Sequence, residues 1–142
     1  MRKAYIIVAH KNPGQLHRLV SRLNDGNSEF FIHIDKKADL SHFQKLLEFG
    51  PSVHFLKRFD SKWGSLGTIE PFLDGLRSID SAPKKFDRVL LLSGQDYPIK
   101  SNLQIDEFFR NSPHSVFLNY FPIPDHEKWQ GSVRVRVCKR SP

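Results

Sequence analysis

The stretch RVLLLSGQDYP (residues 88–98) joins a continuous apolar run to a polar, glycine-containing turn, and it decides the predicted fold. Residues 88–92 have the pattern of a strand buried on both faces, which is typical of parallel sheets. Residues 93–98 must then form a loop at the carboxyl end of that strand. Because ligands bind outside the carboxyl ends of strands in open parallel sheets, the same stretch predicts one edge of a candidate site.

Strand-like and helix-like segments alternate on both sides of this stretch. Two predicted helices open with capping boxes, formed by Asn12 with Gln15 and by Ser101 with Gln104. This alternation predicts an α/β fold with a mostly parallel sheet and helices on both faces. The expected strands are residues 4–9, 29–34, 53–56, 88–92 and 115–120, and the expected helices are residues 12–23, 40–47, 66–79 and 101–109.

The 142 residues are enough for one domain with a substantial core. Hydrophobic residues make up 39% and charged residues 26%, which favours an ordinary globular protein over a disordered or fibrous one. No apolar stretch approaches the roughly 20 residues of a membrane helix. The basic, briefly apolar start of the chain is predicted to be a strand rather than a signal peptide. A cytoplasmic or peripheral membrane location is therefore expected, and the single cysteine, Cys138, excludes an internal disulfide.

The formal net charge of +7 suggests an anionic partner: a nucleic acid, an anionic lipid or a phosphorylated small molecule. The positive residues are scattered, with local density at residues 36–37, 84–85 and 134–140. Scattered basic residues are also the ordinary pattern of a solvated surface. The charge alone leaves both interpretations open.

Several common functional motifs are missing from the sequence. It contains neither G-x-G-x-x-G nor G-x-x-x-x-G-K-[ST], which excludes the usual dinucleotide and P-loop sites. It has no H-E-x-x-H and no cysteine and histidine set at zinc spacing, so no metal site is expected. No G-x-S-x-G marks a serine hydrolase, and no spacing supports a catalytic triad.

Three polar clusters follow predicted strands, at His10-Lys11, at residues 35–37 and at residues 93–96. Since the carboxyl ends of parallel strands meet at one edge of a sheet, these clusters are expected to lie together. Polar residues are common at strand ends, so a purely structural role is the alternative for each cluster.

Each candidate residue has a functional and a structural interpretation. The carboxylate of Asp35 is suited to accept hydrogen bonds from a uracil N–H or a ribose hydroxyl, or it caps the following turn. Asp96 follows the most apolar strand, where a buried carboxylate needs a partner or a ligand to replace its lost hydration. The structural alternative is that Asp96 is only a turn residue. Trp63-Gly64-Ser65 precedes a helix whose free N–H groups suit a diphosphate, or Trp63 packs in the core and Ser65 caps the helix.

Four segments occur in an informative order: AYIIVAHKNP (residues 4–13), IHIDKK (residues 32–37), WGS (residues 63–65) and LLSGQDYPIKSN (residues 91–102). Together they resemble the core-2/I-branching family, glycosyltransferase family fourteen, which includes β-1,6-N-acetylglucosaminyltransferases and peptide O-xylosyltransferases. The resemblance implies a GT-A-like, Rossmann-like fold, a UDP-sugar donor and inversion at the anomeric carbon. It also implies metal independence, since the family lacks the cation-binding D-x-D and this sequence has none. Basic side chains would then neutralise the leaving diphosphate.

The resemblance also implies roles for individual residues. Asp35 matches the aspartate that contacts the uridine, and His10 lies in the strand motif beside the nucleotide. Asp96 matches the aspartate that faces the transferred sugar and the acceptor, whereas Glu127 with Trp129 resembles an acidic-aromatic pair of the acceptor region. The implied catalytic residues are Asp96 and Glu127, and the implied donor-binding residues are His10, Asp35, Lys36, Trp63, Gly64, Ser93, Gly94 and Gln95.

Family catalytic domains are longer than this chain, and their glutamate base and the basic pair that holds the diphosphate lie in the second half. The resemblance therefore implies a fold that is incomplete at its C-terminus. Residues 1–121 would form the nucleotide-sugar-binding part, and residues 122–142 the start of the acceptor region or an irregular basic tail.

The predicted function is inverting, metal-independent transfer of N-acetylglucosamine or xylose from a UDP-sugar to a glycan or protein hydroxyl. The expected partners are the UDP-sugar donor and the acceptor, with no cofactor and no nucleic acid, and peripheral membrane association is a further expectation. One alternative is a truncated, non-catalytic nucleotide-binding or interaction module. Another is a basic nucleic-acid-binding domain, which the lack of interleaved aromatic and basic residues disfavours.

Overall fold

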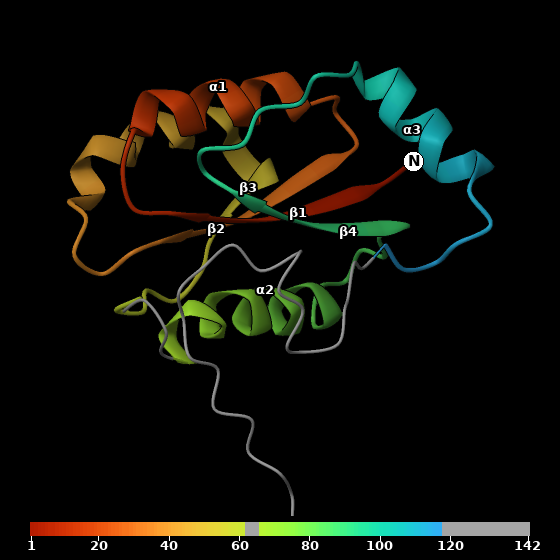
Figure 1. Ribbon diagram of the computed structural model, residues 1–142. Helices are drawn as coiled ribbons and strands as arrows, with labels where there is room; N and C mark the ends of the chain where they lie inside the picture. Colours follow the sequence, from red (N-terminus) through yellow and green to blue (C-terminus); the bar gives the residue numbers. More distant parts are fainter. Residues whose placement is uncertain (62–65, 118–142) are drawn as a thin grey trace, which may run out of the picture. The chain divides into compact units, whose positions relative to one another are not determined.

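A four-stranded parallel sheet with the strand order β3-β2-β1-β4 forms the centre of the structure (Figure 1). Its strands are β1 (Lys3–Ala9), β2 (Ser28–Ile34), β3 (Val53–Phe55) and β4 (Arg88–Ser93). β1 lies between β2 and β4 and is parallel to both, and β2 is parallel to β3. This computed structural model describes residues 1–61 and 66–117. The predicted α/β class with a parallel sheet is confirmed.

Helices cover both faces of the sheet, as predicted (Figure 1). One face carries α1 (Pro13–Leu23), the 3₁₀ helix η1 (Leu40–Ser52) and α3 (Asn102–Asn111), and the other carries α2 (Glu70–Asp80), which follows the short 3₁₀ turn η2 (Leu66–Thr68). The chain therefore changes face between β3 and β4. The strand that follows, β4, pairs with the edge of β1 opposite to the edge that pairs with β2.

The chain divides into two compact units, Met1–Arg110 and Asn111–Pro142. The sheet belongs to the first unit. Of the second unit the structure describes residues 111–117, where the rings of His114 and Phe117 meet edge to face at 6.4 Å between centroids. The predicted boundary at residues 121–122 lies outside the described residues and stays a prediction.

The core has one layer on each face of the sheet, because alternate residues of a strand point to opposite faces. On the α1 side, Tyr5, Ile7 and Ala9 belong to a buried cluster with residues of α1, β2 and η1. On the α2 side, Ala4 and Ile6 belong to a smaller cluster against which Phe72 and Ile79 pack. The pattern predicted from apolar spacing therefore produces a two-sided core.

Gly75 explains how α2 approaches the sheet. A Cβ atom at this position would lie 2.7 Å from Cγ2 of Ile6, closer than carbon atoms can pack. Glycine weakens a helix by roughly 1 kcal/mol relative to alanine. Here it allows close contact between α2 and β1, which offsets that weakness.

The two predicted capping boxes have different outcomes. The Ser101 box forms: its N–H donates to Oε1 of Gln104 at 3.0 Å, and the Gln104 N–H donates to Oγ of Ser101 at 3.2 Å. The other prediction is wrong. Asn12 is the N-cap residue of α1, but its backbone is left-handed (φ 54°, ψ 60°) and its side chain makes no capping bond. The side chains of Asn12 and Gln15 bond instead to the loop after β4.

The expectation that β4 is buried on both faces is wrong. Within the described residues β4 lies at an edge of the sheet, and its side chains alternate between half-buried and exposed. Val89 is 40% exposed and Leu91 is 53% exposed, because the cluster under α2 centres on β1 and β2 and does not include them. Four consecutive apolar residues therefore indicated a strand but not its place in the sheet.

Two further elements differ from the predictions. The helix expected at residues 40–47 is a 3₁₀ helix, broken at Gly50 (φ 57°), and its Leu47 is 64% exposed. Of the strand expected at residues 115–120, residues 115–117 are not in a strand and residues 118–120 lie outside the described part.

An ion cluster occupies the amino edge of the sheet. The side chain of Lys3 is completely buried, and its Nζ donates to Oδ2 of Asp25 at 2.7 Å and to Oδ1 of Asp106. Burial lowers the pKa of Lys3, but the two carboxylates outweigh burial and raise that pKa above its ordinary value. Burial raises the pKa of both aspartates, yet Lys3 holds each below its ordinary value. The cluster ties β1 to the α1–β2 loop and to α3.

Candidate functional site

The loops after β1, β2 and β4 meet at the carboxyl edge of the sheet. The Asp35 N–H donates to the carbonyl of Ala9 at 2.8 Å, and the Gly94 N–H donates to the carbonyl of Val8 at 2.9 Å. The end of β1 therefore holds the start of both neighbouring loops. Because the chain winds to opposite sides of β1, the carboxyl ends of β1 and β4 form a topological switch point, the place where open α/β sheets bind ligands. The predicted convergence of the three polar clusters is confirmed.

The loop after β4 is closed by its own polar groups. Oδ2 of Asp96 accepts a hydrogen bond from the Ser93 N–H at 2.8 Å, and Oγ of Ser93 accepts one from the Gln95 N–H at 3.2 Å. Asp96 is exposed, so the expectation of a carboxylate that needs a ligand to replace lost water is wrong. The reason is the edge position of β4, which leaves the loop in solvent. Asp96 closes this turn through Oδ2, Oδ1 lies outside this bond, and its catalytic role stays a prediction.

Gly94 is required by the close approach of this loop to β1. A Cβ atom at Gly94 would lie 2.7 Å from Cβ of Ala9. The site therefore depends on two small residues in contact, Ala9 and Gly94. A binding role for Gly94 stays a prediction, whereas its packing role follows from this distance.

The start of α1 is joined to the loop after β4. Nδ2 of Asn12 donates to Oε1 of Gln95 at 3.0 Å, and Nε2 of Gln15 donates to the carbonyl of Asp96 at 3.3 Å. The left-handed backbone of Asn12, a conformation that asparagine tolerates better than most residues, turns its side chain towards Gln95. Asn12, Gly14, Gln15, Arg18 and Gln95 line an open, polar hollow of about 580 Å³.

Asp35 is the most constrained acid of this edge. It is only 6% exposed, Oδ1 accepts from the Lys37 N–H at 2.8 Å, and Oδ2 accepts from the Ser61 N–H at 3.0 Å. Burial raises the pKa of Asp35, but these two N–H donors, the Ser61 side chain and the charge of Lys37 together hold it below its ordinary value. Asp35 is therefore an ionised carboxylate at neutral pH. Each oxygen keeps a lone pair that these bonds do not use.

Arg58 binds the loop that contains Asp35 through backbone carbonyls. Its Nε donates to the carbonyl of Ile34 at 3.1 Å, and its Nη2 donates to the carbonyls of Asp35 at 2.7 Å, Lys36 at 3.1 Å and Ala38. The carbonyl of Phe59 also accepts from the Lys36 N–H at 3.0 Å. We call residues 34–38 and 58–61, with these bonds, the Arg58 clasp.

His33 lies beneath the Arg58 clasp. It is completely buried, and its Nε2 accepts a hydrogen bond from the Phe59 N–H at 2.9 Å. An acceptor Nε2 means that the ring is neutral with its proton on Nδ1. Burial is the main reason why the pKa of His33 is lowered, and the charge of Arg58 acts in the same direction, whereas the charge of Asp35 opposes them.

The structure brings most of the predicted donor-site residues together. Asp35, Lys36, Ser93, Gly94 and Gln95 lie in the loops that meet at the end of β1, and exposed His10 directly follows β1. Trp63, Gly64 and Glu127 lie outside the described residues, so their predicted roles stay predictions.

The site residues predicted from the sequence did not include Arg58, His33 or Asn12. Arg58 sits in an ordinary basic segment, and its acceptors are backbone carbonyls that no side-chain pattern records. His33 belongs to the IHIDKK motif and lies two residues before Asp35, and this position was the available signal that His33 is part of the edge.

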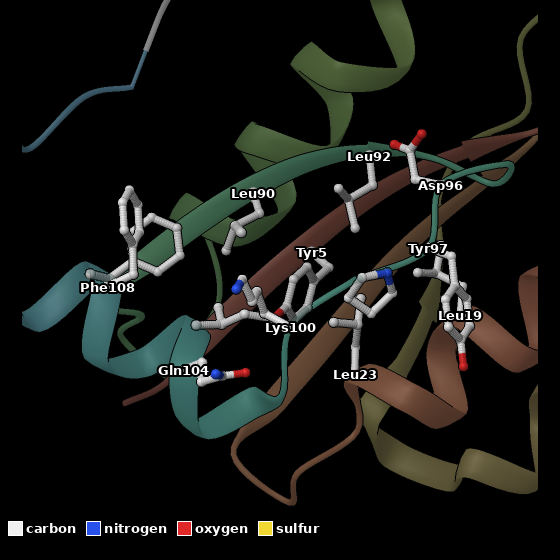
Figure 2. A pocket seen from close by; sticks show the side chains of 13 residues that line it. Tyr5, Leu19, Leu23, Leu90, Leu92, Asp96, Tyr97, Lys100, Gln104 and Phe108 are labelled. Atoms are coloured by element: carbon white, nitrogen blue, oxygen red, sulfur yellow. The ribbon is translucent and has the colours of Figure 1, made fainter.

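An apolar cavity of about 470 Å³ lies beside the site, between α1, β4 and α3 (Figure 2). Its wall is mainly Tyr5, Leu19, Leu23, Leu90, Leu92 and Phe108, with Asp96, Tyr97, Lys100 and Gln104 among the other lining residues. Figure 2 shows the Asp96 carboxylate directed away from the apolar side chains. This cavity continues the α1-side core, because Leu90, Leu92 and Ile105 pack against that cluster. It offers few polar groups for a nucleotide.

No cluster of histidine, cysteine, aspartate or glutamate within residues 1–61 and 66–117 is arranged to hold a metal ion. No helix in the same part of the chain has the length and apolar character needed to cross a membrane.

Comparison with known proteins decides the family. The sequence model of the core-2/I-branching enzymes matches residues 3–139. The chain belongs to this family. The resemblance noted in the four ordered segments is thereby confirmed, and members of the family include glycosyltransferases.

Individual relatives of the core-2/I-branching chain are similar at low identity. Xylosyltransferase oxt of Drosophila melanogaster is 28% identical over 73% of this chain and 12% of its own length. Xylosyltransferase 2 of Homo sapiens is 27% identical over 83% of this chain and 14% of its own length. A beta-1,3-galactosyl-O-glycosyl-glycoprotein beta-1,6-N-acetylglucosaminyltransferase 4 of Danio rerio is 26% identical over 72% of this chain and 25% of its own length. The chain thus spans a quarter or less of these proteins.

Proposed function

We propose that this chain is the nucleotide-sugar-binding part of an inverting glycosyltransferase that uses a UDP-sugar. The donor sugar would be N-acetylglucosamine or xylose, and the acceptor a hydroxyl of a glycan or protein. Membership of the core-2/I-branching family supports glycosyl transfer. The names of the relatives, which are xylosyltransferases and an N-acetylglucosaminyltransferase, support these two sugars.

The observation that carries the proposal is the state of Asp35. It is an almost fully buried carboxylate, fixed by two backbone N–H groups at the ligand-binding edge of a parallel sheet. Each of its oxygens keeps a lone pair, which suits the N3–H of uracil or a ribose hydroxyl. A hydrogen bond to an ionised acceptor contributes about 1.5–3 kcal/mol, enough to select a uridine nucleotide.

Diphosphate binding without a metal is part of the proposal. The sequence has no D-x-D, and its formal net charge is +7. Exposed basic side chains, Lys11, Arg18, Lys36 and Lys37, lie on the segments of the carboxyl edge. Cationic groups stabilise the charge that develops on a leaving diphosphate, so they can take the place of a divalent cation.

The transfer itself needs an acceptor oxygen to attack the anomeric carbon as its bond to the diphosphate oxygen breaks. A base must take the proton of the attacking hydroxyl. Asp96 is exposed and is proposed to face the transferred sugar and the acceptor. Glu127 remains the other proposed catalytic residue. Since the chain spans at most 25% of the three relatives, we expect the base to be supplied by sequence beyond the described residues.

A second candidate function is a non-catalytic nucleotide-binding module. A chain that lacks the base would bind the nucleotide without turning over a sugar. The two candidates share the Asp35 site and differ only in catalysis, so incubation of a UDP-sugar with an acceptor separates them.

Calorimetric titration with UDP, with and without EDTA, tests the proposal. Asp35→Asn replaces one charged acceptor by an amide, and we expect UDP binding to weaken about 10- to 100-fold. Because one N–H of Lys37 or Ser61 then loses its acceptor, a thermal melt must show that the variant is folded. Asp80→Asn, at the exposed end of α2, removes the same charge and is expected to leave affinity unchanged.

Three results would contradict the proposal. Absence of saturable UDP binding by the folded chain would contradict the donor site. Equal affinity of the wild type and Asp35→Asn would contradict the role of Asp35. Loss of binding in EDTA would contradict metal independence while leaving a donor site in place.

A further inference from the structure

Arg58 has an unusual set of partners for a half-buried arginine. Within the described residues, the guanidinium bonds to the backbone carbonyls of Ile34, Asp35, Lys36 and Ala38, and the last three share the two hydrogens of Nη2. These carbonyls come from residues 34–38, which follow β2 and contain Asp35. Arg58 supplies donors to the carbonyls of this turn, and a buried carbonyl without a partner destabilises a fold. The Asp35 carbonyl also accepts from the Ala38 N–H at 3.0 Å.

The segment that carries Arg58 makes further bonds to β2 and to the same turn, with donors on both sides. Phe59 donates its N–H to Nε2 of buried His33 at 2.9 Å, and Ser61 donates its N–H to Oδ2 of Asp35 at 3.0 Å. The Lys36 N–H donates to the carbonyl of Phe59 at 3.0 Å, and Nζ of Lys37 lies 2.7 Å from Oδ1 of Asp60. Arg58 therefore stands at the centre of a two-way attachment between residues 34–38 and 58–61.

This attachment determines which lone pairs of Asp35 are used. Ser61 reaches Oδ2 only while residues 58–61 stay against the turn, and Lys37 reaches Oδ1 only while the turn keeps its shape. With both bonds in place the carboxylate has one orientation. Without them it can rotate and fold back on its own loop.

We propose that Arg58 is a positioning residue for nucleotide binding, which fixes residues 34–38 so that Asp35 presents its unused lone pairs at the carboxyl edge. The proposal rests on the proposed function in that the ligand is UDP. Arg58 acts through Asp35 and residues 34–38 and need not touch the nucleotide. Arginine suits this place because its planar fork offers five donors at fixed angles, whereas lysine offers three on a single nitrogen.

The first test needs no ligand. The pKa of the Asp35 carboxyl group and the exchange rate of the Ser61 amide are measured by NMR in the wild type, Arg58→Ala and Arg58→Lys. We expect the pKa of Asp35 to rise towards its ordinary value in Arg58→Ala, because the N–H donors leave, and the Ser61 amide to exchange at least about tenfold faster. Arg77→Ala, an exposed arginine of α2, removes the same charge and should change neither quantity.

The second test measures UDP affinity by calorimetry on the same variants. Arg58→Ala is expected to bind UDP at least about tenfold more weakly, since a small misplacement of a fixed group weakens its interaction strongly. Added methylguanidinium should restore part of the lost affinity, whereas methylammonium should not. Arg77→Ala should bind within about twofold of the wild type, the scatter expected for an exposed surface substitution.

Distinct results contradict the inference and the function on which it rests. A folded Arg58→Ala chain with unchanged UDP affinity and an unchanged Asp35 pKa would overturn the positioning role. If Arg58→Ala does not fold, Arg58→Lys becomes the test, and wild-type values for that variant would overturn it. If the wild type does not bind UDP, the proposed function fails, and the Asp35 pKa and Ser61 exchange still decide whether Arg58 fixes the turn.

Discussion

The two edges of the same sheet use charge in opposite ways. At the amino edge, completely buried Lys3 is paired with Asp25 and Asp106, so the charges are satisfied by one another. At the carboxyl edge, Asp35 is held by backbone N–H groups, and within residues 1–61 and 66–117 its oxygens take part in no ion pair. Here Lys36 and Asp96 are exposed.

This difference separates a structural cluster from a candidate site. A charge that is neutralised by its neighbours has little left to offer a ligand, whereas a carboxylate fixed by neutral donors keeps its charge and some lone pairs. Perturbed pKa values occur at both edges, so the kind of partner distinguishes them better than the shift itself.

Removal of the buried charge at the amino edge should have the largest effect on stability. In Lys3→Met both aspartates lose the buried cation between them, although Met1 and Arg110 still pair with Asp106. The free energy of unfolding should fall by about 3 kcal/mol. Chemical denaturation measures this change. Lys45→Met, at an exposed position of η1, is the control and should be nearly neutral.

Lys3→Met also tests whether the two edges of the sheet are independent. Lys3→Met should leave the UDP affinity of the folded chain unchanged, because Lys3 belongs to the amino edge. A loss of affinity without loss of fold would show that the edges are coupled and that their separation is wrong.

Enlarging the contact between β1 and the loop after β4 should have the next largest effect. Gly94→Ala places a Cβ atom 2.7 Å from that of Ala9, and neither backbone can retreat without breaking the bond from Gly94 N–H to Val8. We expect a loss of about 1–3 kcal/mol in the free energy of unfolding, together with weaker UDP binding.

Gly14→Ala is the matched control for Gly94→Ala. Nothing lies within 4 Å of a Cβ atom at Gly14, which is in the first turn of α1. This variant should be neutral or slightly stabilising, since alanine favours a helix. Equal effects of the two substitutions on unfolding would contradict the close packing at the carboxyl edge.

Protonation of His33 at acidic pH should have the smallest effect on the free energy of unfolding. Because the pKa of buried His33 is lowered in the fold, the unfolded chain takes up its proton first as the pH falls below the ordinary histidine value of about 6.5. The stabilisation due to neutral His33 is complete above that pH. It decreases as the pH falls towards the folded pKa, by at most about 1.4 kcal/mol per pH unit.

His33→Gln should remove this part of the pH dependence, because the glutamine carbonyl can accept from the Phe59 N–H without titrating. Denaturation curves between neutral and mildly acidic pH measure the difference from the wild type. His42→Gln, an exposed histidine of η1, should keep the wild-type dependence. Identical slopes for the wild type and His33→Gln would contradict a neutral, acceptor His33.

Local patterns of the sequence predicted much of the fold because apolar spacing records which face of an element is buried. They predicted the strands of the sheet, the helix faces and the meeting of the clusters at His10, Asp35 and Asp96. They did not place β4, since an apolar run has the same pattern at the centre of a sheet and at its edge. The wrong expectation that Asp96 is buried follows from that error.

The Arg58 clasp was beyond local patterns for a different reason. Arg58 bonds to carbonyls that are 20 to 24 residues away in the chain, and every residue type has a carbonyl. His33 was visible in a motif but gave no sign that its Nε2 accepts from a backbone N–H. Contacts between a side chain and distant backbone appear only once the strands are in register.

A titration of the isotope-labelled chain with UDP, followed by amide chemical shifts, tests the central claim most directly. We predict saturable shifts at His10, Lys36 and Gln95 on the carboxyl edge, unchanged by EDTA, and none at Lys3, Asp25 and Asp106 on the amino edge. A folded chain whose carboxyl-edge amides do not respond to UDP, or whose response is confined to the amino edge, would contradict the account.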